Sequence, residues 1–188
     1  NCTNYGNIVI SDTCEEDLDS IGGIVGENSP SEGKVKNCIN YGNINAYGSS
    51  IGGICGYNDV TVENCINKGN ENIKKDTSNQ IGGIIGQNAG DCINCFNSGK
   101  ITTENNTNVG GIVGQNGWKY SSNMATIKNC YNIGEIIGKT NIGGIAGINL
   151  INIDKASVIE NSYYLKSTTT VGYTNDTGST SIDGSKDI

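Results

Sequence analysis

The sequence has no histidine and no arginine among its 188 residues, and it has only one proline, one tryptophan, one phenylalanine and one methionine. Without histidine there is no imidazole base, no Ser-His-Asp or Cys-His pair and no histidine ligand for zinc. Without arginine there is no bidentate guanidinium clamp for phosphate or carboxylate. These absences exclude the common triad hydrolases and the histidine-ligated zinc proteins.

Positive charge and long apolar runs are also scarce. The 12 lysines face 19 acidic residues, and the formal net charge is -7. An acidic chain without basic blocks lacks the electrostatic signature of nucleic-acid or anionic-membrane binding. No apolar run approaches the roughly 20 residues that span a bilayer. We therefore expect no nucleic-acid partner, no membrane insertion and no cofactor.

Two short motifs alternate along the chain and use the residues that are abundant. The first is Asn-Cys-x-Asn-x-Gly, and its copies begin at Asn1, Asn37, Asn64, Asn94 and Asn129, with a decayed copy at Asn161. The second is Ile/Val-Gly-Gly-Ile-x-Gly-x-Asn, and its copies begin at Ile21, Ile51, Ile81, Val109 and Ile142. Because the first motif begins at residue 1, we expect the chain to be a segment of a larger protein, monomeric within it.

The spacing of the motifs predicts stacked structural units. Copies of the second motif follow one another at intervals of 30, 30, 28 and 33 residues. Such a period is typical of repeat architectures. Frequent Gly and Asn disfavour helices, and Ile and Val favour strands. The sequence therefore predicts an all-β parallel β-helix, or β-solenoid, of about five to six coils of roughly 30 residues.

Alignment of the repeats predicts which positions face inward. The residue three before the motif cysteine is apolar in every complete repeat, as at Val62 and Ile127. The residue two before the cysteine is mostly charged, so it should face water. Stacking would then pair Lys36 with Glu63 and Lys128 with Glu160 about 4.8 Å apart along the axis.

The repeated Asn and Gly positions have a structural interpretation. We expect the amides of the Asn before the cysteine, and of the Asn two after it, to form ladders between coils. The Gly four after the cysteine is expected to supply a positive φ. The Gly-Gly pair is expected to allow bending or packing where a Cβ would clash.

The paired motifs resemble the GLUG repeat. That repeat is found in large bacterial surface proteins and adhesins, and in the N-terminal regions of immunoglobulin A1-specific metallopeptidases. The resemblance covers residues 1–165 and implies a right-handed parallel β-helix outside a bacterial cell. Residues 166–188 depart from the pattern, are rich in Ser, Thr, Gly and Asp, and are interpreted as a capping strand or a linker to another domain.

Seven of the eight cysteines are interpreted as packing residues. Cys2, Cys38, Cys65, Cys95 and Cys130 fill one repeat position, Cys92 takes a Val/Ile position and Cys55 takes another apolar position. A buried free cysteine behaves as a small hydrophobe. We expect thiols and no metal site, because the cysteines are spread along an axis and no two CxxC pairs converge. Only Cys14 lies in an insertion.

Binding residues in a solenoid are expected on its insertions. One insertion contains Trp118, Lys119 and Tyr120, where an aromatic pair could hold a sugar ring or form a protein hot spot. The alternative is that Trp118 folds back over an exposed coil edge and blocks lateral pairing. The acidic insertion 9–20 could bind calcium, although it matches no calcium-loop signature, or it is simply a solvated loop.

The sequence supports three non-catalytic hypotheses. The chain could be an adhesive module that binds a host protein or glycan through its loops, a stalk, or the non-catalytic N-terminal region of a secreted metallopeptidase. In each case the expected location is the bacterial surface or the exterior. A polysaccharide-active β-helix is disfavoured, because no two carboxylates share a position in neighbouring coils as glycoside hydrolysis requires.

Overall fold

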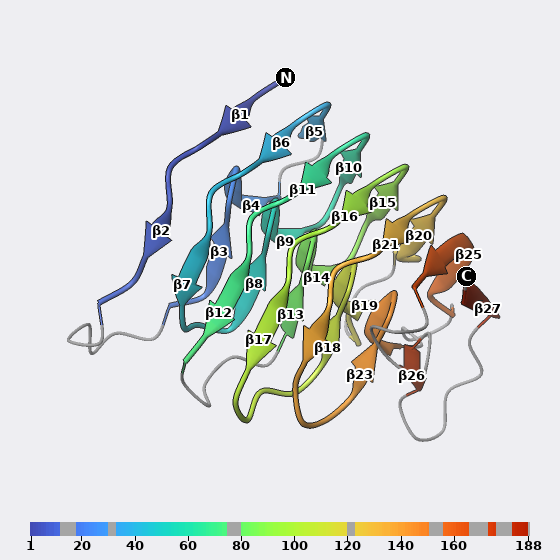
Figure 1. Cartoon of the computed structure of the whole chain (residues 1–188). Helices are drawn as coiled ribbons and strands as arrows, with labels where there is room; N and C mark the ends of the chain where they lie inside the picture. The colour runs from blue at the N-terminus through green and yellow to red at the C-terminus, as the bar shows by residue number, and fades with distance from the viewer. Residues whose placement is uncertain are drawn as a thin grey trace.

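The chain winds into a parallel β-solenoid, as the repeats predict (Figure 1). The structure, a computed structural model, describes residues 1–11, 18–29, 33–74, 80–119, 123–150, 156–165, 173–175 and 182–187. These residues form strands, turns and bends and contain no helix. Every strand pair in the described ranges is parallel, so the fold is all-β.

The largest sheet contains the strands on both sides of each motif cysteine. Its members are β1 (Thr3–Asn4), β5 (Lys34–Lys36), β6 (Ile39–Asn40), β10 (Thr61–Glu63), β11 (Ile66–Asn67), β15 (Asp91–Ile93), β16 (Phe96–Asn97), β20 (Thr126–Lys128), β21 (Tyr131–Asn132), β25 (Val158–Tyr164) and β27 (Ile182–Asp187). Their order is β1-β6-β11-β16-β21-β25-β20-β15-β10-β5, and β27 pairs with β25.

Three smaller sheets complete the walls of the solenoid. The second sheet contains β2 (Ile8–Val9), β7 (Ile44–Ala46), β12 (Glu71–Ile73), β17 (Ile101–Thr103) and β22 (Ile136–Ile137). The third contains β3 (Ser20–Gly22), β8 (Ser50–Gly52), β13 (Gln80–Gly82), β18 (Val109–Gly110) and β23 (Ile142–Gly143). The fourth contains β4 (Val25–Asn28), β9 (Cys55–Asn58), β14 (Ile85–Asn88), β19 (Val113–Asn116), β24 (Ala146–Asn149) and β26 (Tyr173–Asn175).

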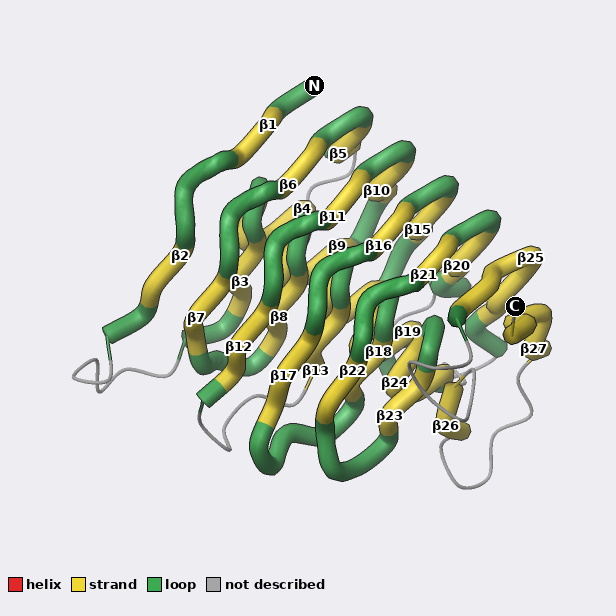
Figure 2. The backbone as a smooth tube through the Cα atoms, in the orientation of Figure 1, coloured by secondary structure: helices red, strands yellow, loops and turns green. Residues whose placement is uncertain are grey.

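One coil runs through β6, β7, β8, β9 and β10 before β11 returns to pair with β6. Figure 2 shows the short loops that turn the chain between these strands. Equivalent repeat residues pair in register, so each repeat position becomes a column along the axis. The handedness, the number of coils and the boundary at residue 165 stay predictions. In the segment after that boundary, β26 pairs with β24 and β27 pairs with β25.

The interior contains apolar columns and asparagine ladders, both as predicted. Ile44 and Ile101 are almost completely buried in one such column, and Ile51 and Ile81 in another. The Asn two after each cysteine is buried from Asn40 to Asn132, and its amide bonds to the next copy, with Nδ2–Oδ1 distances of 2.8–3.0 Å from Asn4 to Asn132. A second buried ladder runs from Asn28 to Asn149 at the end of the other motif. An exposed ladder joins the Asn residues that precede the cysteines.

The predicted role of the first motif's glycine is wrong. The positive φ lies on the Asn before each cysteine, for example 54° at Asn94, and the glycine has no positive φ. Asn tolerates this left-handed conformation. The glycine is required for a different reason: a Cβ on Gly42 would collide with the backbone oxygen of Gly6 in the neighbouring coil. The Gly-Gly pair behaves as predicted, because a Cβ on Gly53 would collide with the Asn67 amide.

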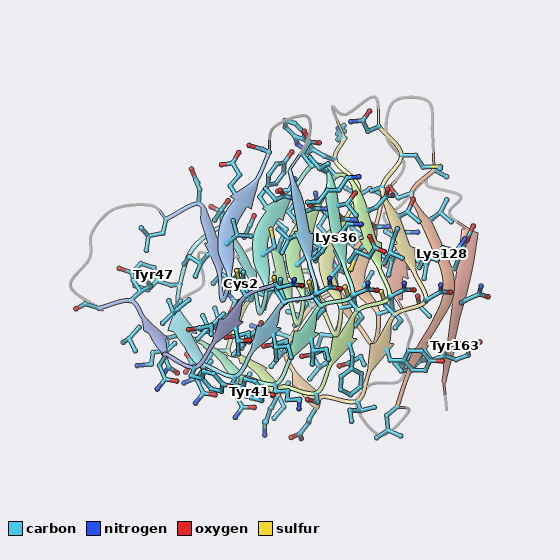
Figure 3. The ribbon with its side chains drawn as sticks, turned by 90° about the horizontal axis from the view of Figure 1, so that it is seen from above. Cys2, Lys36, Tyr41, Tyr47, Lys128 and Tyr163 are labelled. Atoms are coloured by element: carbon cyan, nitrogen blue, oxygen red, sulfur yellow. The ribbon has the colours of Figure 1, made fainter. Side chains whose placement is uncertain are left out.

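The charged column outside the solenoid is confirmed. Lys36 forms an ion pair with Glu63, and Lys128 Nζ lies 2.8 Å from Glu160 Oε2. Both lysines project from the wall formed by β5 and β20 (Figure 3). These pairs are largely exposed, so we assign them a small stabilising role.

Candidate functional site

Trp118 lies directly after β19 and reaches back along the stack toward Tyr57 on β9. The two rings meet edge to face, with their centroids 6.5 Å apart. Tyr57 pairs in register with Gln87, which pairs with Gln115, so the Trp118 loop passes over one intervening coil. Trp118 is 42% exposed, and Lys119 is exposed beside it. Tyr120, the third predicted binding residue, lies outside the described residues.

A groove of about 350 Å³ lies in the same part of the chain. It is lined by Asp59, Val60, Thr61, Gly90, Asp91, Asn123 and Met124. Asp59 and Asp91 supply the two carboxylates of the groove. The repeat alignment did not bring them together, because the register partners of Asp91 in the neighbouring coils are Thr61 and Thr126. Asp59 was missed because it belongs to the turn before β10 and occupies no strand position. Burial raises the pKa of Tyr57, and the nearby Asp59 and Glu27 carboxylates raise it further. The corner of the solenoid around Tyr57 and Trp118 therefore favours neutral or cationic ligand groups.

A second candidate surface covers the outer side of the strands that follow the cysteines. We call it the aromatic face. It consists of two adjacent columns. The first column is Ile39, Ile66, Phe96, Tyr131 and Tyr163, and the second is Tyr5, Tyr41, Lys68, Ser98, Ile133 and Leu165. The preceding cysteine and the intervening Asn point inward, so strand alternation sends these columns outward.

The rings of the aromatic face stack on one another along the axis. Tyr5 and Tyr41 are parallel within 6°, with their centroids 5.0 Å apart. Tyr131 and Tyr163 stack similarly, with their centroids 5.1 Å apart. Lys68 Nζ lies 5.1 Å from the Tyr41 ring centroid. In Figure 3, Tyr41 and Tyr163 project from the same side of the solenoid near its opposite ends, so the face extends along the stack.

The neighbouring wall differs in character. Its outward column, on the second sheet, is polar at Asn45, Asn72 and Thr102 and has aliphatic residues at its two ends, Val9 and Ile137, with no aromatic side chain. A concentration of apolar and aromatic side chains therefore distinguishes the aromatic face from this wall. Sequence reasoning missed the face, although the signal was present: the position after the cysteine is apolar in five successive copies, and alternation places it outside.

Three cysteine side chains form the candidate metal centre within the described residues. The sulfur atoms of Cys92, Cys95 and Cys130 all lie within 4.8 Å of one another, and all three residues are buried. The sulfurs of Cys92 and Cys130 are 3.9 Å apart. Cys92 and Cys95 form a CxxC pair, and the sequence predicted no metal site because no second CxxC pair converges on it. The structure brings Cys130 to it from the next coil, because Cys92 pairs with Ile127 three residues before Cys130.

The other described cysteines follow the predicted positions with one exception. Cys38, Cys55 and Cys65 are buried free thiols. Burial raises the pKa of Cys55 to about 12, and a hydrogen bond with Cys95 followed by burial raises the pKa of Cys65, so both thiols stay protonated at neutral pH. Cys2 was predicted to be in the core but is exposed, because among the described residues its coil stacks on one side only, against the coil that contains Cys38. Cys14 lies outside the described residues, as do the other residues of 12–17, which make up half of the acidic insertion 9–20.

Glu71 is a buried ionisable residue that the sequence did not reveal. It occupies the inward column of the second sheet, between Ile44 and Ile101. It is fully buried, and its Oε1 accepts a 3.3 Å hydrogen bond from Asn67 Nδ2. Its Oε2 has no hydrogen-bond partner among the described residues. Burial therefore raises the pKa of this carboxyl well above its ordinary value.

Comparison with known proteins identifies the repeat. The family model of the GLUG motif matches residues 105–137. This segment runs from the loop before β18 through the Trp118 loop to β22. Neither curated proteins nor solved structures give a match. None of the described residues belongs to a helix that could cross a membrane.

Proposed function

We propose that this chain, a GLUG-repeat protein, is a non-catalytic binding module that holds a partner protein on its aromatic face. The module would serve adhesion within a larger bacterial cell-surface or secreted protein. That setting is supported by the resemblance of its repeats to those of bacterial surface proteins. The observation that supports binding is the pair of outward columns, aromatic and aliphatic at all positions except Lys68 and Ser98, in which Tyr5, Tyr41, Tyr131, Ile133 and Leu165 are exposed.

The composition of the aromatic face fits a protein partner. Tyrosine is enriched at protein interfaces because it offers apolar area at small entropic cost together with a hydroxyl group. Tyr131 is 43% exposed and Tyr41 is 40% exposed, although both lie on regular strands or directly after them. Stacking on neighbouring rings holds these side chains in place before a partner arrives, which lowers the entropy lost on binding.

The stacking also argues against a sugar as the main ligand of this face. Sugar rings bind flat against an open aromatic face. Tyr41 has Tyr5 on one side and a lysine ammonium near its ring, and Tyr131 is covered by Tyr163. The tyrosines therefore present ring edges and hydroxyls, together with aliphatic groups such as Ile133. Such a surface is complementary to protein side chains.

The test uses binding of the whole chain to an array of extracellular-matrix proteins and glycans. The double variant Tyr41→Ser/Tyr131→Ser removes aromatic area from the face. The control is Ile137→Ser. The exposed fraction of Ile137, 42%, is similar to that of Tyr131, but Ile137 lies on the neighbouring wall. Trp118→Ala tests the corner where the sequence placed the site.

We expect saturable binding to one or more proteins, weakened at least about tenfold by the double variant and unchanged by Ile137→Ser. Binding of glycans alone, lost on Trp118→Ala, would contradict the proposal and locate the site at the corner. No saturable binding by the wild-type chain would also contradict it and would favour a stalk. Circular dichroism of each variant checks that the β-structure is retained.

A further inference from the structure

The three sulfurs of Cys92, Cys95 and Cys130 have the separation that a shared metal ion requires. A metal–thiolate bond of about 2.3 Å, the length found for zinc, places three sulfurs roughly 4.0 Å apart in a trigonal plane. The sulfurs of Cys92 and Cys130 are 3.9 Å apart, and no pair in the cluster exceeds 4.8 Å. An ion at the centre would therefore need only small side-chain adjustments.

The repeat explains why the cluster forms at one place among the described residues. The motif cysteines form one column, but the neighbouring inward column contains Val35, Val62, Ile127 and Ile159 in the other coils. Only Cys92 introduces a sulfur into that second column. The sulfur of Cys92, which lies outside the main column, therefore forms a triangle with the sulfurs of Cys95 and Cys130.

The donor set selects a soft metal ion. Thiolate ligands favour ions such as Cu(I) and Zn(II) over hard cations. Structural zinc takes four ligands. Ser162, the hydroxyl residue that follows Cys130 in this column, already donates to the Glu160 carbonyl at 2.9 Å and accepts from the Cys130 N–H at 3.2 Å. Cu(I) is satisfied by three sulfurs and needs no oxygen ligand.

We propose that Cys92, Cys95 and Cys130 form a buried three-sulfur site for one Cu(I) ion. The backbone N–H of Cys95 points at Cys130 Sγ from 3.5 Å and provides a hydrogen bond that supports the bound sulfur. Metal binding releases thiol protons to solvent. The three residues are fully or almost fully buried, so the ion enters as the coils close during folding.

The test compares copper retention in four chains refolded without oxygen in the presence of Cu(I). Cys92→Val removes one ligand and inserts the residue found at the equivalent Val62. Cys130→Ser removes another and inserts the residue that follows in the column at Ser162. The control Cys55→Val removes a buried thiol outside the cluster and inserts the residue found at the equivalent Val25. All four chains keep Cys2 and Cys14, so any binding by those thiols cancels in the comparison.

After gel filtration against a competing Cu(I) chelator, we expect the wild type and Cys55→Val to retain one copper per chain more than the two ligand variants. We also expect Cu(I) to raise the melting temperature of the first two chains only, because an ion bound to the folded state stabilises it. Zn(II) in place of Cu(I) is expected to give no such difference.

Three results would overturn the assignment. Equal copper in all four chains would show binding outside the cluster. No copper in the wild type, whether added before or after refolding, would show that the thiols do not bind it. Cys92-dependent retention of Zn(II) but not Cu(I) would show that the site selects a different ion. If Cys130→Ser fails to fold, the comparison of the wild type with Cys92→Val decides the outcome, because valine is the residue at the equivalent position Val62 and keeps the apolar column intact.

Discussion

Glu71 should make the stability of the folded chain depend on pH. Its carboxyl is fully buried between two isoleucines, and burial raises its pKa well above the ordinary value of 4.5. The folded state therefore keeps the proton at pH values where the unfolded state has released it. Raising the pH then favours unfolding, so the stability is fully present below pH 4.5 and is lost as the pH rises toward the folded pKa.

The size of the effect follows from one proton. Between the two pKa values the unfolded state binds one proton fewer than the folded state, so the free energy of unfolding falls by about 1.4 kcal/mol per pH unit. Over two pH units the loss is about 2.7 kcal/mol, a large share of the 5–15 kcal/mol typical of a whole domain. Glu71→Ile inserts the residue of both neighbouring coils and should remove this loss.

The assay is urea unfolding of the wild type and Glu71→Ile from pH 5.5 to 7.5. The difference in the free energy of unfolding between the two chains should grow with pH at the stated slope until the pH reaches the folded pKa of Glu71. Glu71→Gln should flatten the pH dependence similarly, because an amide does not titrate. Glu104→Gln, an exposed change, should keep the wild-type slope, since it leaves Glu71 in place. Equal slopes for the wild type and Glu71→Ile would refute the reasoning.

Three further predictions concern the ladders and the glycines. Gly83→Ala should destabilise the fold by about 3 kcal/mol in urea unfolding, because the new Cβ collides with the Asn97 amide and the Gly111 carbonyl, whereas Gly6→Ala, whose nearest obstacle is 3.5 Å away, should change little. Asn97→Ala should cost about 2–4 kcal/mol by the same assay, since it removes one hydrogen bond from each of the buried amides of Asn67 and Asn132 in the neighbouring coils; a cost below about 1 kcal/mol would count against the ladder. Asn94→Ala should destabilise by roughly 1 kcal/mol and Asn94→Gly by less, because glycine accepts a φ of 54° and alanine does not; the reverse order in thermal melts would contradict this.

The β-solenoid could be predicted because each repeat position is sampled several times. A single apolar residue says little, but five copies of one position average out the exceptions. The same averaging gave the inward Val62 and Ile127 and the outward pairing of Lys128 with Glu160, all of which the structure confirms. It also gave the asparagine ladders, since a side chain that both donates and accepts can bond to identical copies above and below.

The conformations of Asn and Gly could not be separated from the sequence. Both residues adopt left-handed backbone conformations, and both recur near the cysteine. The deciding factor is the distance between coils: at Gly42, Gly69, Gly99 and Gly134 the backbone of the preceding coil leaves no room for a Cβ. Glycine is used there for its size, and Asn takes the positive φ at the turn. Distances between coils depend on the folded stack, so the repeat pattern alone could not reveal them.

The role of a residue that departs from the repeat in a single coil could not be predicted by comparing copies of its position. Glu71 fills an isoleucine position in one coil, and Cys92 fills a Val/Ile position in another. The sequence analysis assigned Cys92 to the core, which is correct for its packing. The approach of Cys130 to Cys92 depends on the lateral separation of two inward columns. That separation requires coordinates. The binding prediction at Trp118, Lys119 and Tyr120 remains a prediction, with Trp118 placed against Tyr57.

In-register stacking turns every repeat position into a column, and this determines where new chemistry can arise. A column of identical residues is stable when its side chains complement their own copies, as Asn, Ile and stacked Tyr do. An inward residue that cannot interact in this way with its neighbours in the column leaves polar or sulfur atoms in the core without the partners they would otherwise have. Glu71 leaves an oxygen without a partner, and Cys92 gathers three sulfurs that could share an ion. The repeated columns thus supply the scaffold and an extended outer face, while the single departures from the repeat create its inner polar and thiol sites.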